Sequence, residues 1–180
     1  QCHIGRSEQK SREIMALYSD QALQQALALV QEIETQTDRG AAIIGAAWIE
    51  EEINAAIESF LNKDKSSWDR LFRKSGPLSS FSAKIDLARL LGIVSAVVSS
   101  DLHIIRTIRN DFAHSILEKD NSILSFNTPR IKDKCLAIRS VEHETICDPR
   151  VAFIRACAVL NSDFYLYKLI CPNIGNASQI

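Results

Sequence analysis

The run Ile104-Ile105-Arg106-Thr107-Ile108-Arg109-Asn110-Asp111-Phe112-Ala113-His114 contains the pattern that determines how the whole chain folds. Its apolar residues return every three or four positions, which predicts an amphipathic helix with one buried face. The same run holds two arginines, an asparagine, an aspartate and a histidine. Polar side chains placed among apolar ones lose hydration on folding, so they need partners or serve a function. This segment is therefore the first place to search for both the core and a site.

Helical signals also dominate the rest of the chain. Four prolines and six glycines are few for a protein built from strands and turns, and no segment shows convincing strand alternation. We therefore expect an all-α fold, a single-domain bundle of six or seven helices. Capping residues and apolar positions at helical spacing predict helices at about 7–34, 39–61, 80–98, 101–117, 130–140 and 150–170.

Residues that favour helix ends set the expected boundaries. We expect Asp38 to cap the second helix and Ser99 or Ser100 to cap the fourth. A capping side chain followed directly by proline marks the beginnings of the last two helices, at Thr128-Pro129 and Asp148-Pro149. An irregular stretch is expected at 62–78, and a polar loop or short hairpin at 118–127.

The length of the chain suits one domain with a proper core. No internal repeat, low-complexity tract or second domain is evident. We expect an N-terminal helix at 1–36, packed as one unit with a helical domain at 37–172, and a frayed tail at 173–180.

Composition restricts the classes of function. The 21 lysines and arginines nearly balance the 22 aspartates and glutamates, which argues against bulk electrostatic capture of DNA or RNA, although a local basic cleft remains compatible with it. The five cysteines are odd in number and never separated by only two residues, so neither a disulfide framework nor a zinc site is expected. No apolar run is long enough to span a bilayer. We expect a cytoplasmic protein without metal or cofactor.

Arg109 raises the first question about the segment quoted above. At 100° per residue it falls inside the apolar face formed by Leu102, Ile105, Ile108, Phe112 and Ile116. A buried arginine needs a counter-charge, so we expect Arg109 to be largely buried and paired with a carboxylate from the helix at 39–61 or its cap. Such a pair is either a structural clamp or part of a site. We expect the partner to be Asp38 or Glu51; the other candidates are Glu50, Glu52, Asp86 and Asp111.

A polar row raises the second question. His103, Arg106, Asn110 and His114 follow one another at spacings of three and four, so they share one face of the helix. The row is either a solvated face or a site where an arginine, an amide and two histidines converge. The second possibility fits anion binding, with Arg106 and His103 as binding residues, or acid–base chemistry on a phosphate.

Four stretches of the chain resemble the mannitol-repressor (MltR) family of bacterial transcription regulators, and the resemblance extends over about residues 38–170. The family implies an all-helical protein that lacks a DNA-binding domain and acts on transcription indirectly, through protein partners. With it we expect a homodimer that binds no DNA sequence directly. The stretches that carry the resemblance are Thr37–Ala42, Gly76–Ile85, Ile105–His114 and Phe126–Cys135.

The string Arg109-Asn110-x-x-x-His114 is also similar to the Arg-x4-6-His motif of HEPN domains, helical modules that include metal-independent ribonucleases. This resemblance implies catalytic roles: Arg109 would hold the scissile phosphate, and His114 would help to move the proton of the 2′-hydroxyl. Asn110 occupies a position that is often polar in the motif. A regulator of the mannitol-repressor type is therefore the first hypothesis. A HEPN-type endoribonuclease, or an inactive relative that binds RNA, is the alternative, and whether the protein is an enzyme stays open.

Overall fold

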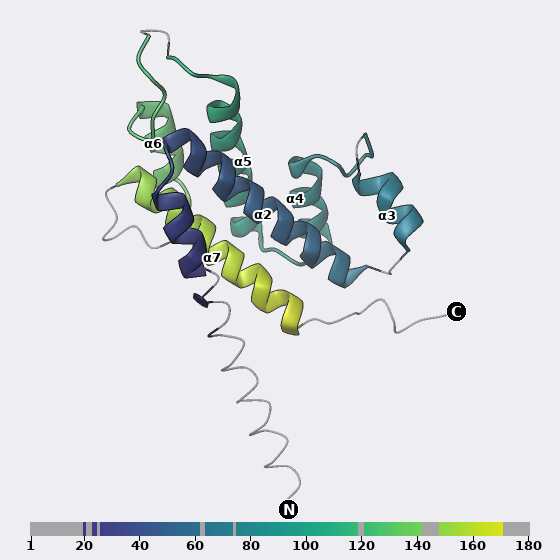
Figure 1. Ribbon diagram of the computed structural model, residues 1–180. Helices are drawn as coiled ribbons and strands as arrows, with labels where there is room; N and C mark the ends of the chain where they lie inside the picture. The colour runs from purple at the N-terminus through teal and green to yellow at the C-terminus, as the bar shows by residue number, and fades with distance from the viewer. Residues whose placement is uncertain are drawn as a thin grey trace, which may run out of the picture.

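Helix α2 (Asp38–Phe60) runs through the middle of the computed structural model, where α4, α5 and α7 pack against it (Figure 1). Its buried positions are small or β-branched, which lets the neighbouring helices approach closely. A side chain at Gly45 would come within 3.0 Å of the Cys157 sulfur, so glycine here allows α7 to lie directly on α2. The structure describes residues 20, 23–24, 26–61, 64–73, 75–118, 121–141 and 148–170.

The all-α prediction is confirmed. The described residues form six bounded helices and a helical segment at 26–34, with no strand; one isolated bridge joins Leu117 to Ile123. Helix α6 packs on α5 and α7, and α4 packs on α2 and α5. The remaining helices are α3 (Lys65–Phe72), α4 (Phe81–Leu90), α5 (Ala96–His114), α6 (Pro129–Leu136) and α7 (Pro149–Ile170).

The predicted boundary between the third and fourth helices is wrong. Helix α4 ends at Leu90, because Gly92 adopts a positive φ of 75° that closes the helix. The amide of Ile93 donates to the carbonyl of Ala88 (2.9 Å) and that of Gly92 to Arg89 (3.2 Å), the paired bonds of a glycine C-cap. Helix α5 then begins with Ser95 as its cap, whose hydroxyl accepts from the amide of Val98. The expected caps Ser99 and Ser100 lie inside its first turns.

Other helix ends differ in smaller ways. The expected irregular stretch at 62–78 contains α3, whose cap Asp64 accepts hydrogen bonds from two amides of the first turn. Thr37 caps α2 in place of Asp38, which is instead the first residue of that helix. The cap at Asp148-Pro149 is confirmed, since the Asp148 carboxylate accepts from the amides of Arg150 and Val151. The expected beginning of the first helix and the tail at 173–180 lie outside the described residues.

One ion pair joins four separate parts of the chain. Arg150, in the first turn of α7, pairs with Asp38 at the beginning of α2. The other terminal nitrogen of this guanidinium donates to the carbonyls of Ile33, Glu34 and Gln36, at 3.2, 3.3 and 2.7 Å, where the helical segment at 26–34 ends. The second Asp38 oxygen accepts from the amide of Phe126 at 2.9 Å. Arg150 thus satisfies carbonyls that the end of a helix leaves without partners.

Replacing Arg150 with glutamine tests this junction. The variant leaves the half-buried Asp38 without its cation and three carbonyls without a donor, so we expect the free energy of unfolding to fall by about 3 kcal/mol. Urea denaturation followed by circular dichroism measures the change. Arg155→Gln is the matched control, because Arg155 is an exposed arginine on the same helix; we expect it to stay within about 0.5 kcal/mol of wild type. Equal stability of the two variants would contradict the role of the junction.

Candidate functional site

The two arginines of the quoted run line a pocket of about 320 Å³ between α5 and the beginning of α4. Helix α5 contributes Arg106, Arg109 and Asn110, and α2 contributes Glu50. The opposite wall is the short run Ser79–Ser82, which forms the N-terminal end of α4. We call this the arginine pocket. It brings together three of the residues that the sequence selected.

The carboxylate of Glu50 is shared between two cations at the arginine pocket. One oxygen of Glu50 lies 2.7 Å from the ammonium of Lys84, and the other lies 3.4 Å from a terminal nitrogen of Arg109. The second terminal nitrogen of Arg109 donates to the Asn110 amide oxygen at 3.1 Å. The Lys84 side chain is only 7% exposed, so Glu50 is the counter-charge that allows a lysine to be buried.

The partner of Arg109 differs from the expected one, although it belongs to the expected helix. Asp38 is engaged by Arg150, and Glu51 faces solvent. The Arg109 side chain is 33% exposed, so it is half-buried rather than largely buried. Arginine commonly buries part of its stem while keeping its charged head accessible, which fits a side chain that lines a pocket and pairs with Glu50.

Arg106 is the cation of the pocket that has no partner. It makes no hydrogen bond or ion pair with the described residues, and its Nε atom is enclosed by protein without an acceptor. Buried polar groups of this kind are rare, because each one gives up water without compensation. The pocket therefore holds one arginine that is neutralised within the protein and one that is free to meet a ligand.

The two histidines of the polar row lie outside the arginine pocket. The Nε2 atom of His103 lies 3.1 Å from Asp86 and faces the exposed side of α4. His114 is exposed at the last position of α5. The predicted row therefore divides: Arg106 and Asn110 belong to the pocket, whereas neither histidine reaches it.

Sequence reasoning missed the side chains that complete the pocket. Lys84 occupies the apolar face of its helix, between the buried residues Phe81, Ile85 and Ala88. A single lysine at such a position was a signal for a buried ion pair. Serines at 79–82 favour the beginning of a helix, but nothing in the sequence places them beside α5.

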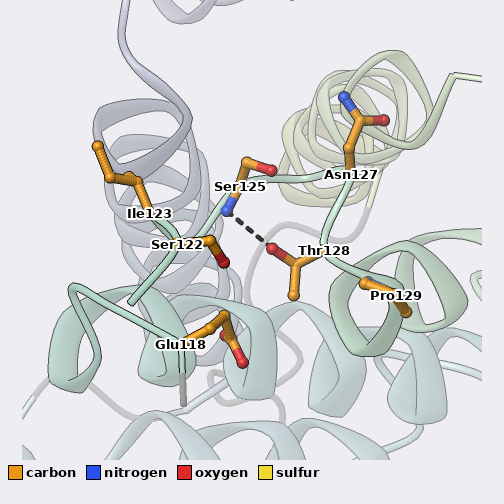
Figure 2. A pocket seen from close by; sticks show the side chains of 7 residues that line it. All are labelled: Glu118, Ser122, Ile123, Ser125, Asn127, Thr128 and Pro129. Carbon is orange, nitrogen blue, oxygen red and sulfur yellow. Dashed lines mark hydrogen bonds between the residues drawn. The ribbon is translucent and has the colours of Figure 1, made fainter. Parts of the chain in front are cut away.

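A second pocket, of about 470 Å³, lies at the turn between α5 and α6 (Figure 2). The Thr128 hydroxyl accepts from the Ser125 amide at 3.1 Å and holds the loop together. Glu118 is fixed by Arg130, with 2.7 Å between their nearest atoms, and these hydrogen bonds raise the pKa of Arg130. Three apolar side chains at this pocket are 50–75% exposed: Ile123, which lines it, and Ile116 and Leu117 on the preceding segment. We call these three residues the apolar hairpin.

Other chemistry finds little support among the described residues. They contain no group of three or more histidine, cysteine or acidic side chains that could hold a metal ion. Cys135 and Cys157 are buried free thiols. Burial raises the pKa of Cys135 to about 12, and it raises the pKa of Cys157 as well, so neither is poised as a nucleophile. No helix in the described part of the chain is long and apolar enough to cross a membrane.

Comparison with known proteins identifies a related fold. No protein-family model matches the chain, and no curated protein matches it significantly. Among solved structures, the chain is similar to the X-ray structure of the MtlR–HPr complex from Escherichia coli, with a TM-score of 0.58. The match covers 83% of this chain and 99% of the other, at 17% sequence identity. The chain therefore has an MtlR-like helical fold.

The shared carboxylate of the arginine pocket can be tested with Glu50→Gln. This change keeps the shape of the side chain but leaves the buried Lys84 without a counter-charge, so we expect the free energy of unfolding to fall by about 3 kcal/mol. Arg109→Ala leaves the Lys84–Glu50 pair intact and should cost only about 1 kcal/mol. Chemical denaturation at neutral pH measures both.

Glu51→Gln is the control for Glu50→Gln, because Glu51 is the next residue on the same helix and is exposed. We expect it to stay within about 0.5 kcal/mol of wild type. If Arg109→Ala were the more damaging of the two pocket variants, Arg109 rather than Lys84 would be the cation that Glu50 chiefly stabilises.

Proposed function

We propose that the protein is a transcription regulator of the mannitol-repressor type that acts by binding a protein partner. The observation that carries the proposal is the similarity in fold to a protein solved together with HPr, since it covers nearly the whole of that chain. We further propose that the partner here is a small protein of the HPr kind, that the regulator is a homodimer, and that it contacts DNA only through its partners.

The apolar hairpin supports a protein partner. Ile116, Leu117 and Ile123 are 67%, 50% and 75% exposed and lie close together in the chain. Clustered exposed apolar side chains next to a polar rim are typical of surfaces that bind other proteins. Glu118, Asp111, Arg130 and Lys134 form that rim, held by ion pairs of 2.5–3.1 Å. A rim that is fixed in advance loses little conformational freedom on binding.

The geometry of the arginine pocket gives the ribonuclease alternative less support. In that mechanism Arg109 holds a phosphate while His114 moves a proton, so both must reach the same reacting atoms. Arg109 already contacts Glu50 and Asn110, and His114 does not line the pocket. A protein that binds a partner has no need for these two residues to meet.

Partner binding is tested by titration calorimetry with purified HPr from the same cell. We expect saturable binding to the wild-type protein. Ile123→Asp places an unpaired charge in the proposed interface and should weaken binding by at least about tenfold. Leu90→Asp is the matched control, because Leu90 is 84% exposed at the far end of α4, and it should bind like wild type. Absence of binding by the wild type would refute the HPr-type partner, and equal loss in both variants would exclude the apolar hairpin as the contact surface.

The ribonuclease alternative is tested with His114→Ala. His114 is exposed and fills no cavity, so its removal should change the free energy of unfolding by no more than about 0.5 kcal/mol. We expect the wild-type protein to leave single-stranded RNA intact in the presence of a metal chelator. If the wild type cleaves RNA, and His114→Ala abolishes cleavage without changing the melting temperature, the nuclease replaces the regulator as the function.

A further inference from the structure

We propose that the arginine pocket binds a small phosphate monoester through its phosphate group. This inference goes beyond the proposed function, because it assigns a small-molecule ligand to a protein whose proposed activity is to bind another protein. It depends on the charges, the free donors and the size of the pocket.

The charges around the pocket leave a positive surplus. Lys84, Arg109 and Arg106 supply three positive charges there, and Glu50 supplies one negative charge that the first two share. The other carboxylates of α4 and α5 have partners of their own: Asp86 contacts His103, Asp101 accepts two backbone amides, and Asp111 pairs with Arg130 and Lys134. A phosphate monoester near neutral pH carries between one and two negative charges, which matches this surplus.

Arg106 provides the principal donor. Its guanidinium lines the pocket, and no described residue accepts a hydrogen bond from it. A guanidinium presents parallel N–H groups whose spacing matches two oxygens of a phosphate, so one arginine binds it in a bidentate manner. The part of the guanidinium that lines the pocket, rather than the enclosed Nε, is the part that a phosphate would contact.

The beginning of α4 adds donors on the opposite wall. Ser79 and Ser82 are among the residues that line the pocket, and each carries a hydroxyl group that can donate. The Ser80 oxygen accepts from the Ala83 amide at 3.2 Å, which leaves its own proton available to donate. The first amides of this ten-residue helix and its dipole also favour an anion. These residues line the same pocket as Arg106, and their donors would hold the remaining phosphate oxygens.

The size of the pocket favours a small ligand. A volume of about 320 Å³ lies at the lower end of the range for small-molecule sites. It accommodates a phosphate with a short organic group. The pocket is compact and formed by three helices rather than an extended track, so it offers no path for a polynucleotide backbone.

The test is titration calorimetry on the full chain alone, with glucose 6-phosphate as the monoester and glucose as its uncharged counterpart. We expect saturable binding of the ester and none of glucose. Arg106→Gln should weaken ester binding by at least about tenfold, the usual effect of losing hydrogen bonds to a charged group. Arg155→Gln removes the same charge from an exposed site on α7 and should stay within about twofold of wild type.

Two further titrations test the proposal, one with the Ser79→Ala variant and one with a phosphoserine peptide in place of the ester. Ser79→Ala should weaken ester binding severalfold, and it tests the same pocket if Arg106→Gln proves unstable. Absence of ester binding, equal loss in Arg106→Gln and Arg155→Gln, or tighter binding of a phosphoserine peptide than of the ester would each overturn the assignment. Because no partner protein is present, failure here leaves the proposed partner binding unaffected, and failure of HPr binding leaves this result unaffected.

Discussion

The ion pair between Asp38 and Arg150 is the constraint on which the remaining architecture depends. It joins the beginnings of α2 and α7. The Arg150 guanidinium also donates to the carbonyls that end the segment at 26–34, and the Asp38 carboxylate accepts from the amide of Phe126. Residues 33–38, Phe126 and Arg150 are far apart in the sequence, and their polar groups meet at one place. Because each group there would be costly if left unpaired, the junction selects one arrangement of the helices around the core.

A second carboxylate divides the cations around the arginine pocket into two kinds. Glu50 binds Lys84 and Arg109 at once, so those cations contribute to folding, whereas Arg106 remains without a partner. The same helix α5 thereby buries its apolar face in the core and presents a free guanidinium to the pocket. Stability and the capacity to bind a ligand are carried by neighbouring residues one turn apart.

The two pockets described above lie at different positions along α5. Its middle faces the arginine pocket, and its C-terminal end leads into the apolar hairpin and the pocket at Glu118 (Figure 2). A ligand in the first and a protein on the second would both contact segments that continue directly from this helix. If both proposals hold, two sites of different chemistry would adjoin the same helix.

The sequence by itself determined the all-α class, the bounds of α2 and α7 to within a residue or so, and the helix that supplies the partner of Arg109, because apolar periodicity and caps depend on nearby residues. It did not predict the end of α4 at Leu90, because Gly92 lies within an apolar run, Leu90-Leu91-Gly92-Ile93-Val94, that continues the helical pattern and hides the glycine C-cap. Which carboxylate meets which arginine was decided only by tertiary structure. Asp38, Glu50 and Glu51 look alike in the chain, but each projects from α2 in a different direction. The packing of α4, α5 and α7 therefore selects Glu50 for Arg109, leaves Asp38 to Arg150 and exposes Glu51.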